Sequence, residues 1–151
     1  MSIAAAPRSL GGARALATGC VMLATIMQSM DTTIANVAVP YMQASLNASL
    51  DQVNWVLTSY IVAAAIMTPP TGWLARRFGR KELFLVAVGG FTVASILCGA
   101  AQSLEQMVAF RLMQGVFGAP LVPLSQSVLL DIYPRERHGE AMAIWGMGVM
   151  V

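Results

Sequence analysis

The chain has 151 residues, of which 57% are hydrophobic and only 11% are charged, and its formal net charge is +2. Soluble domains are about 45–50% apolar and about 25% charged, so this composition excludes an ordinary soluble domain and favours an integral membrane protein. The sequence contains no dense basic patch of the kind that binds nucleic acid, so we expect no nucleic-acid partner.

The apolar residues are gathered into long stretches, each near the about 20 residues that a helix needs to cross the hydrocarbon core. They predict an all-α integral membrane protein with a short N-terminal segment (1–15) and a partial transmembrane bundle (16–151). The predicted helices are 16–38, 55–74, 83–101, 104–130 and 141–151. Turn chemistry separates them at Pro40, NASLDQ, RRFGRK, AQSLEQ and YPRERHGE. The last stretch is too short to span the bilayer by itself, so we expect the front part of a longer protein.

The basic residues between the predicted helices indicate the orientation. They precede the first helix or lie in the second-to-third and fourth-to-fifth connections, at Arg8, Arg14, Arg76, Arg77, Arg80, Lys81, Arg135 and Arg137. The other two connections contain only the acidic residues Asp51 and Glu105. Because positively charged loops remain in the cytoplasm, the N-terminus is predicted to be cytoplasmic. A cleavable signal peptide over 1–30 is the alternative, although the apolar run is long for one and lacks a convincing cleavage site.

Two ionisable residues lie inside the predicted helices, Asp31 in the first and Arg111 in the fourth. Such residues cost about 2.5–3.5 kcal/mol at mid-bilayer on insertion scales and usually face a protein interior or a water cavity. Asp31 lies about seven residues before Ala38, and Arg111 lies about seven residues after Leu104. At a rise of about 1.5 Å per residue, both lie about 10 Å below the same outer surface. We therefore expect them to face one cavity, paired directly or through water.

A carboxylate inside the membrane suits proton-coupled transport, because its binding and release of H⁺ can drive a conformational change. The alternative is that Asp31 ends its helix, with the hydroxyls of the DTT segment bonding the backbone. Gln28 and Gln114 share the faces of Asp31 and Arg111. They predict either a polar lining or hydrogen bonds between helices.

Two further segments have special backbone chemistry. In QGVFGAPLVP, Gly115 and Gly118 predict close helix packing, and the two prolines predict a bend or local opening, which suits a gate or merely a kinked packing helix. In TGWLARRFGRKELF, Gly72 predicts close approach of a neighbouring helix and Gly79 a tight turn. The basic residues there would hold this connection near anionic headgroups.

No pattern in the sequence favours an enzyme or a metal site. Asp31 has no second carboxylate nearby, and there is no nucleophile–base set or phosphate-binding loop. Cys20 and Cys98 both fall within apolar stretches and predict small buried residues.

Three motifs in order resemble those of a known family. MDTTIANVAVP is similar to the signature L-D-x-T-I-x-N-V-A-L-P, with matches that include Asp31, Thr33, Asn36 and Pro40. GWLARRFGRK is similar to G-x-L-A-D-R-x-G-R-K, and RLMQGVFGAP to R-x-x-Q-G at Arg111, Gln114 and Gly115. The chain thus resembles the N-terminal portion of a major facilitator superfamily transporter, of the fourteen-helix drug:proton antiporters of the EmrB/QacA type. PLSQSVLLDIYP brings it nearer to the EmrB members.

The resemblance implies a major facilitator fold, present here as an incomplete N-terminal half. It implies export of hydrophobic or amphiphilic compounds across a bacterial inner membrane, driven by a proton gradient without a cofactor. Asp31, Arg111 and Gln114 would serve proton coupling. The cytoplasmic loop that latches the two halves of such carriers would include Gly72, Arg77, Gly79, Arg80 and Lys81. A periplasmic adaptor and an outer-membrane channel would be partners.

The sequence departs from the family pattern at one loop position, where Arg76 stands in place of the usual aspartate. The glycine- and proline-rich signature of the fifth helix is expected just beyond Val151. Two alternatives therefore stay open: a related facilitator that exports a narrower metabolite, and a truncated membrane segment that does not transport.

Overall fold

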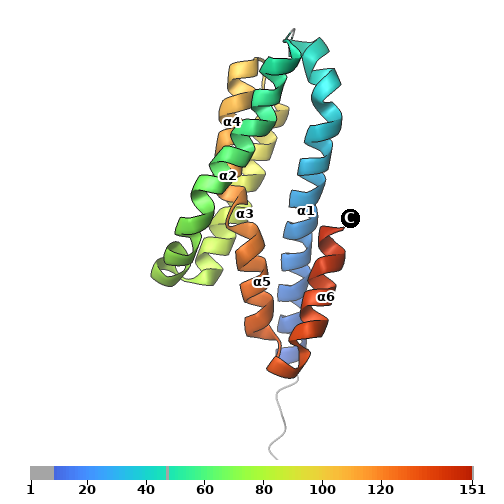
Figure 1. Cartoon of the computed structure of the whole chain (residues 1–151). Helices are drawn as coiled ribbons and strands as arrows, with labels where there is room; N and C mark the ends of the chain where they lie inside the picture. The colour runs from blue at the N-terminus through green and yellow to red at the C-terminus, as the bar shows by residue number, and fades with distance from the viewer. Residues whose placement is uncertain (1–8, 47, 151) are drawn as a thin grey trace, which may run out of the picture.

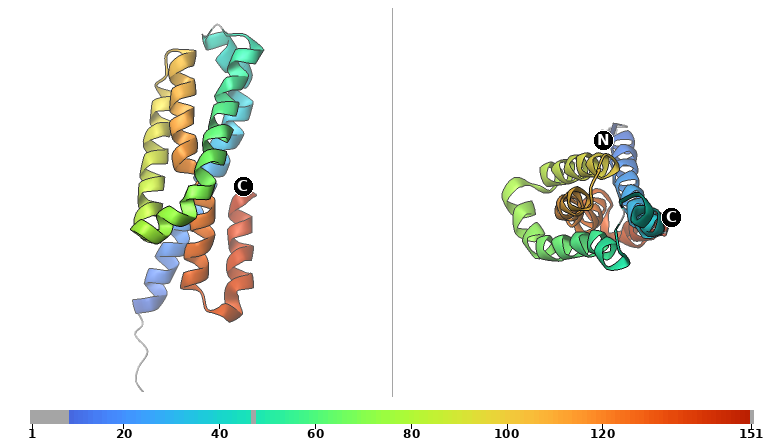
Figure 2. Two further views of the ribbon diagram at one scale, coloured as in Figure 1. Left: turned by 60° about the vertical axis from the view of Figure 1, so that its left-hand side comes forward. Right: turned by 90° about the horizontal axis from the view of Figure 1, so that it is seen from above.

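The computed structural model of the chain describes residues 9–46 and 48–150, so Arg8 lies outside the described residues. Its elements are α1 (Ser9–Leu46), α2 (Leu50–Phe78), α3 (Arg80–Gly99), α4 (Leu104–Gly118), α5 (Leu121–Ile132), the short 3-10 helix η1 (Arg135–Arg137) and α6 (His138–Val149). The helices run up and down one elongated bundle, and α5 continues in the direction of α4 (Figures 1 and 2). The predicted all-α class is confirmed over these residues.

Three helical stretches of the described residues are long and apolar enough to cross a membrane. They are Leu50–Phe78, Arg80–Gly99 and Leu104–Ile132. Helix α1 has 38 residues and so is long enough, but polar residues such as Gln28 and Asp31 lower its hydropathy. It packs against α5 and α6, within the same bundle. Many large apolar side chains point outward from these helices, among them Leu23, Ile66 and Ile96, as lipid-facing residues do.

Helix α1 extends beyond the predicted 16–38 at both ends and passes through Pro40. The prediction that Pro40 marks a break was therefore wrong. A proline removes one backbone donor and bends a helix, but a membrane helix tolerates this loss and continues. The chain turns only after Leu46, and Ala48 N–H donates to the Gln43 carbonyl at 3.2 Å.

Helix α2 begins at Leu50, earlier than the predicted Trp55, because Ser49 and Gln52 form a capping box. The Gln52 N–H donates to Ser49 Oγ at 3.4 Å, and the Ser49 N–H donates to Gln52 Oε1 at 3.0 Å. At its other end α2 is separated from α3 by Gly79 alone. Gly79 has φ of 93°, a left-handed value that favours glycine, so the predicted tight turn is confirmed.

The predicted helix over 104–130 is divided into α4 and α5 by a turn at Ala119 and Pro120. Neither Pro120 nor Pro123 has an N–H to donate to the preceding turn. The predicted local opening of this helix is confirmed. The two pieces remain roughly in line, so together they run the length of the bundle (Figure 1).

Two clusters of buried side chains stabilise the bundle. The larger one joins α1, α3 and α5 through Val21, Ala24, Phe84, Ala87, Phe91, Leu121, Leu124 and Leu129. The smaller one joins α2, α3 and α4 through Val56, Cys98 and Met107. Cys98 is therefore buried as predicted, whereas Cys20 is exposed and that prediction was wrong, because the side of α1 on which it lies is not covered by another helix.

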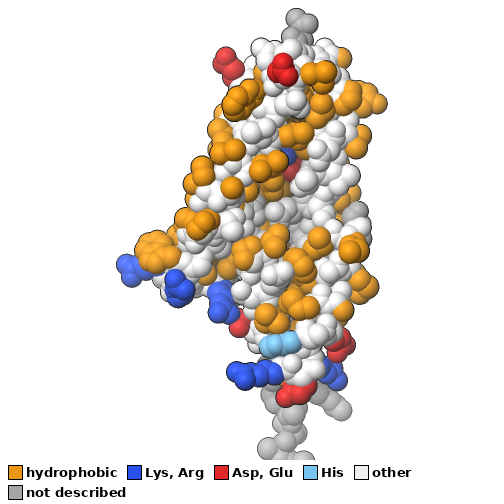
Figure 3. Space-filling view, in the orientation of Figure 1, with side chains coloured by type: hydrophobic (Ala, Val, Ile, Leu, Met, Phe, Trp, Pro, Cys, Tyr) orange, Lys and Arg blue, Asp and Glu red, His pale blue; other side chains and the backbone are white. Residues whose placement is uncertain are grey.

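Charged side chains are gathered toward the ends of the bundle. Figure 3 shows Lys and Arg near its lower end and acidic side chains at both ends. The described basic residues of the α2–α3 turn and of η1 are Arg76, Arg77, Arg80, Lys81, Arg135 and Arg137. Between these ends the surface is largely apolar and uncharged, which fits a bundle surrounded by lipid.

Candidate functional site

The two charges predicted inside the helices form an ion pair between α1 and α4. Arg111 Nη1 lies 2.7 Å from Asp31 Oδ2, and the side chains are only 7% and 14% exposed. The same nitrogen donates to Gln114 Oε1 at 2.9 Å, from the next turn of α4. The expectation that Asp31 and Arg111 face one cavity is confirmed as direct contact. Charge-assisted hydrogen bonds of this kind are the strong ones in proteins.

Gln114 is fully buried beneath this pair. Its Oε1 accepts the bond from Arg111 and lies 3.6 Å from Cys98 Sγ of α3. Among the described residues, neither Gln114 Nε2 nor Arg111 Nε has a partner. The buried polar cluster therefore keeps donors available inside the membrane region, where unpaired polar groups are costly.

Clefts open on both sides of the pair. One of about 120 Å³ lies between α1 and α2 and includes Asp31, Asn36, Val56, Tyr60 and Arg111 in its lining. Another of about 420 Å³ lies between α1 and α3 and includes Asp31, Met42, Ser95, Cys98 and Arg111. The larger volume falls within the about 300–1,000 Å³ that small-molecule sites occupy. The pair is thus nearly buried but borders open space on two sides.

Gln28 lies one turn before Asp31 and makes hydrogen bonds to other helices. This was one of the two roles predicted for it. Its Nε2 donates to Tyr60 Oη of α2 at 3.3 Å and to the Gly118 carbonyl of α4 at 3.2 Å. Sequence reasoning missed Tyr60. The available signal was a tyrosine in the middle of an apolar helix, because a buried phenol hydroxyl needs a hydrogen-bond partner.

Close helix packing was predicted at three glycines and occurs at two of them. A Cβ on Gly115 would lie 2.5 Å from the Tyr60 carbonyl oxygen, and one on Gly118 would lie 3.0 Å from Tyr60 Oη. These contacts let α4 approach α2 near Arg111. A Cβ on Gly72 would meet nothing within 4 Å of the described structure, so the predicted close approach there was wrong: this turn of α2 lies on an open face.

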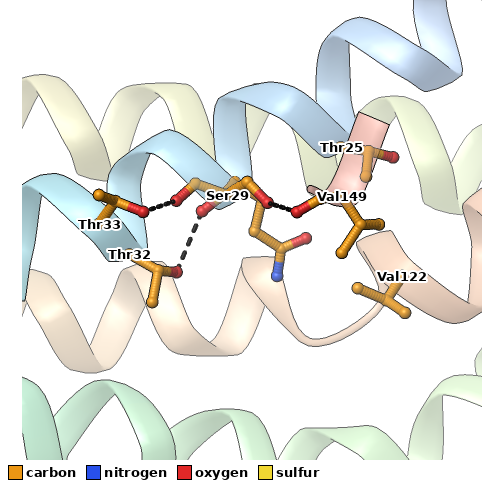
Figure 4. Close-up of a pocket in the computed structure, with 7 residues that line it drawn as sticks. Thr25, Ser29, Thr32, Thr33, Val122 and Val149 are labelled. Carbon is orange, nitrogen blue, oxygen red and sulfur yellow. Dashed lines mark hydrogen bonds between the residues drawn. The ribbon is translucent and has the colours of Figure 1, made fainter. Parts of the chain in front are cut away.

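The other residues of the first signature lie in the C-terminal half of α1. Thr33 Oγ1 donates to the Ser29 carbonyl at 3.1 Å, and Asn36 Nδ2 donates to the Thr32 carbonyl at 2.8 Å. These bonds satisfy the side chains within the helix. Thr33 also lines a groove of about 310 Å³ shown in Figure 4, together with Thr25, Gln28, Ser29, Thr32, Val122 and Val149. Asn36 lines the smaller cleft beside Asp31.

The loop signature is brought to the basic end, and none of its residues contacts the buried pair. Arg80 forms an ion pair with Asp131 at the end of α5, and these side chains are 51% and 59% exposed. Arg77 and Lys81 are also exposed. The loop residues and the Asp31 cluster are therefore two separate regions of the bundle.

The helical spans and the buried ion pair define an integral membrane protein that crosses the bilayer several times. A sequence model described as the Major Facilitator Superfamily matches residues 21–151, and the chain belongs to this family. The resemblance to EmrB-type members is confirmed by curated relatives.

The Multidrug export protein EmrB of Haemophilus influenzae is 52% identical over 145 residues, which are 96% of this chain and 28% of that protein. The Fatty acid resistance protein FarB of Neisseria gonorrhoeae is 47% identical over 96% of this chain and 29% of its own length. The Multidrug export protein EmrB of Escherichia coli (strain K12) is 47% identical over 93% of this chain and 28% of its own length. The chain thus spans less than a third of these relatives.

A solved structure supports the fold. A bacterial homologue of the human lysosomal transporter Spinster, inward-facing and unoccupied, matches with a TM-score of 0.79 and 24% identity over 97% of this chain and 30% of that one. At this identity the match shows the arrangement of helices alone. The predicted incomplete major facilitator fold is confirmed.

Proposed function

We propose that this chain is the front part of a proton-coupled exporter of hydrophobic or amphiphilic compounds in a bacterial inner membrane. The observation that carries the proposal is the Asp31–Arg111 ion pair, nearly buried at 2.7 Å between two helices. The family supports a transporter rather than an enzyme. The proton gradient supplies the energy, and no cofactor is needed.

The pair provides a physical route for coupling. A buried charge left without its partner is strongly unfavourable, so protonation of Asp31 changes the balance of forces between α1 and α4. The flanking clefts let water reach Asp31 from either side. Gain and loss of H⁺ would then favour different arrangements of these helices, which is what alternating access requires. Gln114 serves by holding the Arg111 guanidinium in place.

Orientation, substrates and partners belong to the same proposal. The basic end of the bundle, from which α1 starts, favours a cytoplasmic N-terminus. The names of the relatives EmrB and FarB support amphiphilic compounds, including fatty acids, as substrates. The loop with Gly72, Arg77, Gly79, Arg80 and Lys81 would latch the cytoplasmic side. A periplasmic adaptor protein and an outer-membrane channel would complete the export path.

The test is Asp31→Asn in the complete protein, with dye efflux measured in everted vesicles under an imposed pH gradient. We expect proton-driven efflux to fall to the level of empty vesicles while membrane insertion is unchanged, because asparagine keeps the shape but cannot carry a proton. Asp51→Asn is the control, since Asp51 is an exposed acid at the start of α2. Full efflux with Asp31→Asn would refute the role of this carboxylate.

A further inference from the structure

The break between α4 and α5 is connected to α1 by one side chain. At the break Ala119 and Pro120 form a turn between α4 and α5, just after the Gly118 carbonyl, and both keep helical dihedral angles. Pro123 cannot donate to the carbonyl four residues earlier, so the backbone there has fewer partners than in a regular helix. Gln28 Nε2 donates to the Gly118 carbonyl at 3.2 Å. A side chain from α1 therefore supports the backbone where the helix is interrupted.

The same amide reaches a third helix. Gln28 Nε2 also donates to Tyr60 Oη at 3.3 Å, and Tyr60 lines the small cleft together with Asp31 and Arg111. The Tyr60 hydroxyl lies so near Gly118 that a Cβ there would be 3.0 Å away. Helices α1, α2 and α4 thus meet at one hydrogen-bonded point.

On its other side Gln28 borders a different space. It lines the groove of Figure 4, whose labelled Ser29, Thr32 and Thr33 are arranged along α1 opposite Val122. The hydroxyls of Thr32 and Thr33 are already bonded to the preceding turn of α1, as is visible for Thr33 in the figure. Two lining side chains bond to other helices: Ser29 Oγ donates to the Val149 carbonyl of α6 at 3.0 Å, and the Gln28 amide donates to α2 and α4. Of the lining residues, Gln28 is thus the one bonded to the helices that surround the ion pair. A ligand in the groove that bonded this amide would compete with those two bonds.

We propose that Gln28 is a positioning residue that links occupation of the groove to the Asp31–Arg111 pair, through Tyr60 and the Gly118 carbonyl. The ligand would be an amphiphile with a hydrogen-bond acceptor such as a carbonyl oxygen. The acceptor of the ligand accepts a hydrogen bond from Gln28 Nε2. The Tyr60 hydroxyl and the Gly118 carbonyl at the α4–α5 break then lose their hydrogen bonds to Gln28. This inference rests on the proposed transport function, but it adds a specific route between substrate and proton.

Several charged and titratable groups lie around Asp31, and a test of Gln28 must take each of them into account. Among the described residues that share its clefts, they are Arg111 from α4, Tyr60 from α2 and Cys98 from α3. Gln28 itself does not titrate. A change at Gln28 that moves the pH profile therefore acts through these groups.

The first experiment measures initial efflux rates of rhodamine 6G, which has an ester carbonyl, across a range of pH in proteoliposomes of the complete protein. Gln28→Met keeps the length of the side chain and removes the amide. We expect the midpoint of the pH profile to move by about half to one pH unit, the size of one neutral hydrogen bond. Tyr60→Phe should move it in the same direction by less, and the double variant should move it no further than Gln28→Met. Thr68→Val, which removes a hydroxyl bonded within α2 and away from the groove, should leave it unchanged.

A uniform loss of rate at every pH, with the midpoint unchanged, would overturn the proposal and leave Gln28 a packing residue. Additive shifts in the double variant would also overturn it, because they would mean that Gln28 and Tyr60 act independently.

The second experiment does not depend on transport. Hydrogen–deuterium exchange of the complete protein in nanodiscs should be about fivefold faster across residues 119–124 in Gln28→Met, as for the loss of one hydrogen bond. Thr68→Val should exchange like the wild type across these residues. Equal exchange in Gln28→Met would overturn the link, even if Asp31→Asn abolishes efflux. Conversely, faster exchange with full efflux in Asp31→Asn would mean that the link is present and the proposed proton coupling is wrong.

Discussion

The part of the chain that the structure describes contains two arginine–aspartate ion pairs between helices, and their surroundings are opposite. Asp31 and Arg111 lie between α1 and α4 with side chains 14% and 7% exposed. Arg80 and Asp131 lie at the basic end, where the side chains are 51% and 59% exposed. Exposed pairs contribute about 0–1 kcal/mol, because water and salt weaken the attraction. The same two residue types therefore have different energetic consequences at the two sites. Only in the buried pair does the gain or loss of one proton change the free energy by a large amount.

The packing around each pair explains this difference. Near Arg111, the close approach of Gly115 to the Tyr60 backbone brings α4 against α2, and the Arg111 side chain is only 7% exposed. Near Arg80, the chain consists of a tight turn at Gly79 and the exposed end of α5. The buried site is thus formed by glycines on a helix face, and the exposed one by the ends of helices.

Breaking the buried pair should have the largest effect. Arg111→Met leaves the Asp31 carboxylate without its partner and is expected to destabilise the complete protein by about 3–5 kcal/mol. The measurement is the midpoint of thermal unfolding in detergent. The double variant Asp31→Asn, Arg111→Met should recover much of the loss, since it removes both charges. A double variant as unstable as Arg111→Met would show that the unpaired charge is not the cause.

Filling the packing glycine should have an intermediate effect. Gly115→Ala places a Cβ 2.5 Å from the Tyr60 carbonyl, so α2 must move, at a cost of about 1–3 kcal/mol. Gly72→Ala is the matched control, because that position is open and alanine favours helix. We expect a lower unfolding midpoint for the first and an equal or higher one for the second. Equal midpoints for both would contradict the role of Gly115 in the close approach.

Breaking the exposed pair should have the smallest effect. Arg80→Met is expected to cost less than about 1 kcal/mol, and the difference from wild type should vanish in about 1 M salt, where the Debye length is about 3 Å. The same salt should leave the cost of Arg111→Met nearly unchanged, because that pair is shielded from ions. A large, salt-independent cost for Arg80→Met would remove the contrast between the two pairs.

The sequence was sufficient to predict the buried pair because depth along a helix depends only on counting residues. Asp31 and Arg111 are at similar distances from the ends of their predicted helices, and they meet. The helices themselves follow from apolar length, and the break at Pro120 follows from the missing N–H. The proton-coupling role of the pair stays a prediction.

The sequence did not predict features that depend on rotation about a helix axis. Tyr60 and Gly118 meet Gln28 because α1, α2 and α4 present particular faces to one another, which residue counting does not supply. For the same reason Gly72 looked like a packing glycine although its face is open. The prediction of a break at Pro40 was wrong for a different reason. The proline ring prevents one backbone hydrogen bond, but the other hydrogen bonds of α1 are enough for the helix to continue.

The connection at Gly79 has a mechanical consequence. With one residue between α2 and α3, there is no slack to absorb a rotation of either helix. If α2 rotates about its axis when Tyr60 changes hydrogen-bond partners, the rotation is transmitted to the C-terminal end of α2, where Arg76 and Arg77 lie in the last turn. A rotation of α2 near the ion pair would therefore be felt at the basic end of the bundle, where α3 begins.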